Sequence, residues 1–116
     1  MNLIDAAAWA HEMDVRVTVC NKKGVIVYMN QASALGMHKY GGYELLGKSL
    51  FDCHNPASSA KIREMLEIPS VNVYITEKQE ERRLIRQFPW EENGEHKGII
   101  EFSFALPFDV EVKNRQ

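Results

Sequence analysis

The chain has 116 residues, which is enough for one domain with its own hydrophobic core but not for two. Hydrophobic residues make up 45% of the sequence and charged residues 26%, a composition that excludes a disordered chain. The formal net charge of -2 argues against the clustered basic surface that nucleic-acid binding requires, so we expect no nucleic-acid partner.

The N-terminal residues predict a helix over Leu3 to Met13. Its apolar residues cover most of its circumference, so a single contact with the rest of the chain would not bury them all. If one face packs on the chain's own sheet, Ile4, Ala8 and Trp9 remain turned partly away, and a second subunit is the simplest cover for them. We therefore expect residues 1–14 to form a capping helix through which the protein forms a homodimer.

No membrane or export signal is visible near the N-terminus. The apolar run is interrupted by Asp5 and is far shorter than the ~20 residues that a bilayer demands. No basic segment precedes it, as one would in a secretion signal. The only cysteines, Cys20 and Cys53, lack the close spacing of a disulfide framework or a zinc site. The sequence therefore predicts a cytoplasmic protein without a membrane partner.

A β-hairpin is predicted after the first helix. Val15, Val17 and Val19 alternate with more polar residues, which is the period-2 pattern of a half-buried strand. The segment from Asn21 to Gly24 is typical of a turn, and Val25 to Met29 continues as the second strand.

Short helical segments are predicted in the next part of the chain. Asn30 can cap a helix over Gln31 to Leu35, which Gly36 ends. Tyr43 to Leu46 forms one more turn. A longer helix begins at Asn55 or Ser58 and ends before Pro69.

Three segments rich in β-branched or aromatic residues follow: Val71 to Thr76, Arg83 to Trp90 and Gly98 to Leu106. The last two are joined by a hairpin turn at Asn93-Gly94. The charged run from Glu77 to Arg83 is interpreted as a solvated connection between strands. The order of elements predicts an α+β fold with one mostly antiparallel five-stranded sheet.

Three segments together resemble the signature of the PAS family. They are Val27-Tyr28-Met29-Asn30-Gln31-Ala32, then Tyr43-Glu44-Leu45-Leu46-Gly47-Lys48, and finally Gly98-Ile99-Ile100-Glu101-Phe102. The resemblance spans about Val15 to Leu106 and implies a PAS-like five-stranded antiparallel sheet with short helices on one face, preceded by the extra N-terminal helix. It divides the chain into the helix at 1–14, a PAS core at 15–106 and a C-terminal tail at 107–116.

The resemblance also implies a function. PAS domains are sensory modules of signal transduction that hold a small molecule between helices and sheet and that dimerise. A downstream signalling protein would then receive the signal, and no catalytic activity is expected. The alternatives are a ligand-free interaction module of the same fold and, as a distant third, a small enzyme.

The nature of the cofactor is left open by the sequence. The light-sensing PAS subgroup carries Asn-Cys-Arg-Phe-Leu-Gln after its Gly, whereas Gly47 is followed by Lys48-Ser49-Leu50-Phe51, so photochemistry through a flavin-cysteinyl bond is not expected. His54 lies in the general region from which a histidine binds the iron in haem-binding PAS domains, which the sequence resembles only loosely, and this makes it the candidate metal ligand. The alternative is a hydrogen bond from His54 to a nearby backbone group. Asp52, Cys53 and His54 do not form a plausible triad, because adjacent residues rarely point at one another.

Several residues are candidates for the lining of a ligand cavity, since strand alternation sends every second residue inward. They are Met65, Tyr74, Phe88, Phe102 and Phe104, and a solid core is the equally compatible alternative. Arg86, or its neighbour Arg83, could receive a ligand carboxylate. The favoured alternative is that these arginines pair with Glu77, Glu80 or Glu101 on the solvent face.

Overall fold

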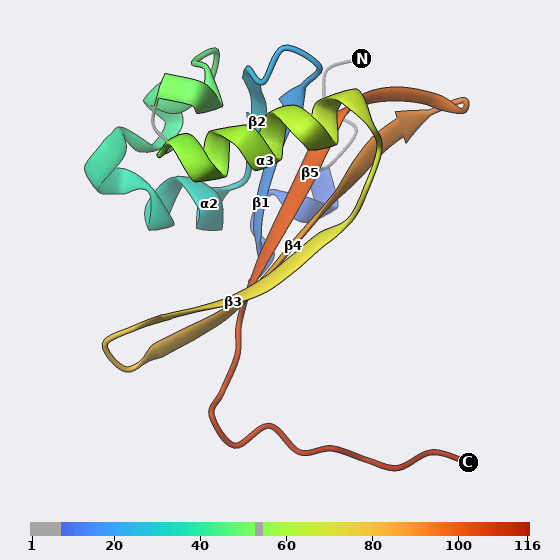
Figure 1. Ribbon diagram of the computed structural model, residues 1–116. Helices are drawn as coiled ribbons and strands as arrows, with labels where there is room; N and C mark the ends of the chain where they lie inside the picture. Colours follow the sequence, from blue (N-terminus) through green and yellow to red (C-terminus); the bar gives the residue numbers. More distant parts are fainter. Residues whose placement is uncertain (1–7, 53–54) are drawn as a thin grey trace.

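The protein folds into one antiparallel sheet of five strands with its helices on one face, in a computed structural model that describes residues 8–52 and 55–116 (Figure 1). The strands follow the order β2-β1-β5-β4-β3 across the sheet. The predicted α+β architecture is therefore confirmed. The strand bounds are β1 (Arg16–Asn21), β2 (Ile26–Met29), β3 (Asn72–Lys78), β4 (Glu81–Glu92) and β5 (Glu95–Ala105).

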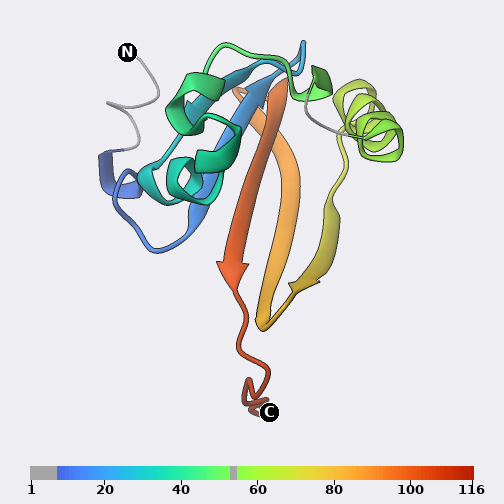
Figure 2. The ribbon, with the colours of Figure 1, turned by 90° about the vertical axis from the view of Figure 1, so that its left-hand side faces the viewer.

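The helices form two separate groups above the sheet (Figure 2). The first group consists of α2 (Gln31–Gly36) and the 3₁₀ helices η2 (His38–Tyr40), η3 (Gly42–Leu45) and η4 (Leu50–Asp52). The second is α3 (Pro56–Glu67), which begins at the predicted cap Asn55, whose side chain accepts a hydrogen bond from Ser58 N at 2.9 Å. None of the helices in the described part of the chain has the length and apolarity needed to cross a bilayer.

Over the described residues 8–13, the chain does not form the N-terminal helix that the sequence predicts. Residues Ala8–Ala10 form one 3₁₀ turn, η1, and the chain then runs through turns and bends to β1. Asn30 Nδ2 and Gln31 N hydrogen-bond to the carbonyls of Ala10 and His11, which a continuing helix would use for its own bonds. The predicted start of the helix, with Ile4, lies outside the described residues.

Asn30 joins the first segment of the chain to the sheet and to α2. Its side chain is fully buried and uses all of its hydrogen-bonding capacity. Oδ1 accepts from Val17 N and Ser33 N, both at 3.0 Å, so it caps α2 as the sequence predicts. Nδ2 donates to the carbonyls of Ala10 at 2.9 Å and Val15 at 2.7 Å.

The charged run from Glu77 to Arg83 is mostly strand, so its interpretation as a solvated connection is wrong. Glu77 pairs with Arg82 and Lys78 with Glu81, which leaves a connection of two residues, 79 and 80. Charged residues have low strand propensity, but backbone pairing in a long hairpin outweighs it and leaves their side chains in water. The hairpin at Asn93-Gly94 forms as predicted, with positive φ at both residues.

The two faces of the sheet carry different hydrophobic clusters. On the helix-covered face, α3 packs onto β1 and β5 through Ile62, Met65, Leu66, Cys20 and Ile99. On the opposite face, Val17, Val19 and Tyr28 form a second cluster together with half-buried residues that include Met13, Trp90 and Phe102.

Candidate ligand-binding site

A cavity of about 280 Å³ lies between the helix-covered face of the sheet and the helices. All five strands contribute residues to it, and the remainder come from α2, η3, η4 and α3 and from Met37, which lies between α2 and η2. Its size is just below the usual range for drug-sized ligands, so it suits a small molecule. The lining residues are Arg16, Thr18, Cys20, Ile26, Met29, Ser33, Met37, Leu45, Leu50, Ile62, Tyr74, Thr76, Arg83, Ile85, Gln87, Ile99, Glu101 and Ser103.

The apolar part of the lining comes from both the sheet and the helices. Ile85 and Ile99 project from neighbouring strands, and Ile62 comes from α3. The thiol of Cys20 also faces the cavity, and burial raises its pKa from 9.0 to about 11. Cys20 is therefore a neutral, hydrophobic group at physiological pH and not a nucleophile.

Polar side chains of β3, β4 and β5 form a hydrogen-bonded row across the cavity face. Asn72 Nδ2 donates to Gln87 Oε1 at 2.9 Å, and Gln87 Nε2 donates to Glu101 Oε1 at 2.8 Å. Burial and the charge of Glu101 raise the pKa of Tyr74. Glu101 lines the cavity, so its carboxylate lies at this part of it.

A second polar contact joins α2 to the sheet. The hydroxyls of Thr18 and Ser33 lie 2.6 Å apart, and Ser33 is only 2% exposed. Both residues line the cavity, so one side of it is set by a hydrogen bond between the strand and the helix.

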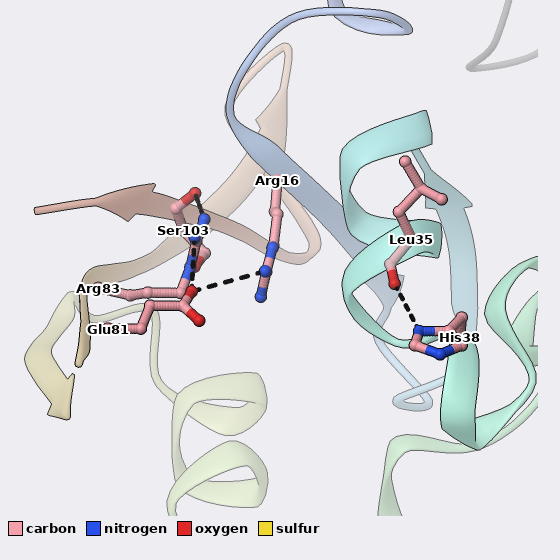
Figure 3. A network of polar contacts seen from close by, with 6 residues as sticks. All are labelled: Arg16, Leu35, His38, Glu81, Arg83 and Ser103. Atoms are coloured by element: carbon pink, nitrogen blue, oxygen red, sulfur yellow. Dashed lines mark hydrogen bonds and ion pairs between the residues drawn. The ribbon is translucent and has the colours of Figure 1, made fainter. Parts of the chain in front are cut away.

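Arg83 lies near the start of β4 and is fixed by three hydrogen bonds (Figure 3). Its Nε donates to Ser103 Oγ at 2.7 Å, its Nη2 to the Ser103 carbonyl at 2.9 Å, and its Nη1 to Glu81 Oε1 at 3.1 Å. The side chain is 14% exposed. Its carboxylate partner is Glu81. The sequence had suggested Glu77, Glu80 or Glu101 instead.

Arg16 approaches the same carboxylate from β1, as Figure 3 shows. Its Nη2 lies 3.7 Å from Glu81 Oε1, and no hydrogen bond joins its guanidinium to another of the residues described by the structure. Burial and the positive charge of Arg83 lower the pKa of Arg16, and Glu81 partly offsets them. Its side chain is 33% exposed.

The structure distributes the predicted site residues over both faces of the sheet. Tyr74 lines the cavity, whereas Met65 lies in the hydrophobic cluster beneath α3 and outside the cavity lining. Four others point away from the helices and lie outside the cavity lining: Arg86, Phe88, Phe102 and Phe104. The three phenylalanines stack edge to face, with ring centroids 5.3 and 6.0 Å apart. His54 lies outside the described residues.

The apolar set of alternating residues in β4 and β5, which contains Phe88, Phe102 and Phe104, was predicted to face inward. The cavity is instead lined by the intervening set, which is mainly polar: Arg83, Gln87, Glu101 and Ser103, with Ile85 and Ile99. Two polar residues of β1, Arg16 and Thr18, belong to the same face and were missed. Their alternation with Val15, Val17 and Val19 was the available signal, but it does not say which face the helices cover.

The part of the cavity that the structure describes does not fit a haem. Its volume is small for a macrocycle, and no histidine belongs to the lining that the structure describes. Within residues 8–52 and 55–116, no group of three His, Cys, Asp or Glu side chains is placed to hold a metal ion.

Comparisons with known proteins agree with this architecture. A family model described as the PAS fold matches residues 11–104. No curated protein matches the sequence. The C-terminal domain of a Streptococcus mutans protein superposes with a TM-score of 0.70 at 15% identity, over 90% of this chain and 85% of its own.

Two further examples are structures of Vibrio cholerae proteins. The Aer2 receptor, described as a dual PAS-heme oxygen sensor, gives a TM-score of 0.61 at 19% identity, over 79% of this chain and 94% of its own. The VqmA dimer gives 0.63 at 17% identity over 97% of this chain, but this chain spans only 55% of that protein. At such identities the similarity establishes the fold alone.

Proposed function

The chain belongs to the PAS family, and on this basis we propose that it is a sensory domain that binds a small molecule between its sheet and its helices. The observation that carries the proposal is the cavity of about 280 Å³. Protein interiors contain few voids larger than a water molecule, whose share of liquid volume is about 30 Å³. A space of this size with an apolar wall and a few fixed polar groups is typical of a ligand site.

The path of the signal is part of the same proposal. Arg83 and Ser103 hold β4 and β5 together next to the end of the sheet. Beyond them, Leu106 N donates to the Arg82 carbonyl at 2.8 Å, and the Arg82 guanidinium lies 5.1 Å from the ring centroid of Phe108. A ligand that shifts Arg83 would change the direction in which residues 106–116 leave the sheet. A downstream signalling protein would read that change, with no reaction catalysed by the domain itself, and we place this exchange in the cytoplasm.

Homodimerisation through the N-terminal segment is a further element of the proposed function. Trp9 is 73% exposed, and an exposed tryptophan of this kind favours burial against a second copy of the chain. The similar VqmA structure is described as a dimer. Light scattering on the full chain should show a dimer at high micromolar concentration, and Trp9→Glu should shift it to monomer. A wild-type protein that stays monomeric would contradict dimerisation.

A ligand-free interaction module is the second candidate function. The outer face of the edge strand β3 exposes Val73 by 49% and Ile75 by 47%, which is unusual for β-branched residues of a monomer. This candidate differs from the sensor in one measurable respect, because it requires no occupied cavity.

Native mass spectrometry is the test of the sensor. We expect the freshly purified protein to carry a bound small molecule, or the emptied protein to gain thermal stability from one member of a metabolite library. Ile85→Phe, which fills the cavity, should abolish both effects. If the protein purifies empty and no compound shifts its melting temperature, the interaction module replaces the sensor.

A further inference from the structure

Two guanidinium groups converge on one carboxylate oxygen at one end of the cavity. Glu81 Oε1 lies 3.1 Å from Arg83 Nη1 and 3.7 Å from Arg16 Nη2. The two arginines repel one another, and Glu81, whose side chain is 55% exposed, is the only carboxylate that the described residues bring within 4.0 Å of either. This small cluster therefore carries two positive charges against one negative charge.

Arg16 is the less satisfied of the two. Arg83 is anchored to Ser103 by two hydrogen bonds, whereas the guanidinium of Arg16 donates none to the described part of the chain. The Arg16 side chain is 33% exposed, and a partly buried guanidinium without hydrogen-bond acceptors is costly, because burial removes water from a charged group. An anionic group on a ligand would supply the missing acceptors.

The two arginines form a wall between the cavity and an open groove on the surface. Both line the cavity, and both line the groove, whose remaining residues are Asp14, Ala32, Leu35 and Gly36. Asp14 gives the groove a negative charge of its own, so an anion is better placed on the cavity side of the wall.

We infer that the ligand is a small monocarboxylate whose carboxylate lies between Arg16 and Arg83 and whose neutral, mainly apolar body occupies the cavity. This inference rests on the proposed function of the cavity. Arginine binds carboxylates with a planar, bidentate geometry. The body would lie against Ile85 and Ile99.

Glu101 restricts the other end of the ligand. Its carboxylate faces the cavity, and its charge contributes to the raised pKa values of Tyr74 and Cys20. A second carboxylate on the ligand would meet this negative charge in a partly dry space. The cavity should therefore discriminate against dicarboxylates of the same length.

Three six-carbon compounds test the inference: hexanoate, 1-hexanol and adipate. They share one chain and differ in having one, no or two carboxylates. Isothermal titration calorimetry gives their affinities, and methyl NMR shows whether they perturb Ile62, Ile85 and Ile99 in the cavity but not Ile75 on the outer face of β3. We expect hexanoate to bind in the cavity at least about 10-fold more tightly than either of the others.

Arg16→Gln is the decisive variant, because it removes the charge without breaking any hydrogen bond among the described residues. Hexanoate should bind it about 10- to 100-fold more weakly, with hexanol binding unchanged. Arg86→Gln is the matched control, since Arg86 is exposed outside the cavity lining, and it should leave both affinities within about twofold.

Gly36→Ala is a second variant that displaces the Arg16 guanidinium without removing its charge. The added Cβ would approach Arg16 Cζ to 2.6 Å, so hexanoate binding should again fall.

The inference is wrong if hexanoate and hexanol bind alike, if Arg16→Gln retains full affinity for hexanoate, or if none of the three compounds perturbs the cavity methyl groups. The proposed function has a different criterion. Suppose that a neutral molecule co-purifies with the wild type but not with Ile85→Phe. This result would contradict the inference that the ligand is a carboxylate, but it would support the proposal that the cavity binds a ligand.

Discussion

Replacement of Asn30 by alanine should destabilise the protein far more than the loss of an ordinary helix cap. The side chain makes four hydrogen bonds, to Val17 N, Ser33 N, the Ala10 carbonyl and the Val15 carbonyl. Removing it leaves two donors and two acceptors without these partners in a region where Asn30 itself is 0% exposed. An unmade buried hydrogen bond costs about 1–3 kcal/mol.

Four such losses do not add fully, because water can enter the space that the side chain vacates and the first segment can move. The lower end of the range gives a destabilisation of about 4 kcal/mol. This is a large part of the roughly 5–15 kcal/mol by which a domain of this kind is stable. We therefore expect Asn30→Ala to unfold at much lower urea concentration than the wild type.

Asn55→Ala is the matched control, since it removes the same side chain from the cap of the other α-helix. Asn55 is exposed and accepts one hydrogen bond, from Ser58 N. Its loss should cost about 1 kcal/mol. Urea unfolding monitored by circular dichroism gives the free energy of unfolding of both variants. Equal destabilisation of the two variants would refute the role assigned to Asn30.

Three further predictions concern the cavity and the sheet. In a Cys53→Ser background, Cys20 should resist thiol reagents at pH 8 until the protein unfolds. Because its pKa is raised from 9.0 to about 11, the protonated thiol contributes to the free energy of unfolding below pH 9, and this contribution is lost as pH rises toward 11. A rapidly reacting folded protein would contradict this environment. Thr18→Val should cost about 1–2 kcal/mol in urea unfolding, because the buried Ser33 hydroxyl loses its partner at 2.6 Å, and an unchanged value would contradict that contact. Gly98→Ala should cost more than about 3 kcal/mol, because its Cβ would overlap the Cys20 carbonyl between β1 and β5, and a fully stable variant would argue against this strand pairing.

The strands and their turns were predictable because their signals are local. The alternation around Val17, the Asn93-Gly94 turn and the caps Asn30 and Asn55 each depend on a few neighbouring residues. The N-terminal segment was not predictable in the same way. Its carbonyls are used by the side chain and backbone of residues 30 and 31, about 20 positions later in the chain, and this long-range contact overrides helix propensity.

The cavity lining was harder to predict than the fold for a geometric reason. Alternation divides each strand into two sets of residues, but only the position of the helices decides which set faces them. Both faces of this sheet bury apolar residues, so the aromatic set containing Phe88 and Phe102 was a reasonable but incorrect choice for the inward side. The polar set containing Arg83 and Gln87 faces the cavity.

The most direct test of the hollow cavity compares two enlargements of buried residues in protein that has been unfolded, dialysed free of small molecules and refolded. Ile85 lines the cavity, whereas Leu66 is equally buried in the cluster beneath α3 and lies outside the cavity lining. Ile85→Phe should change the free energy of unfolding by less than about 0.5 kcal/mol, because empty space receives the ring, and Leu66→Phe should lose about 1–3 kcal/mol through overpacking. Equal losses in the two variants would show a solid core at Ile85 and would contradict the ligand-binding cavity.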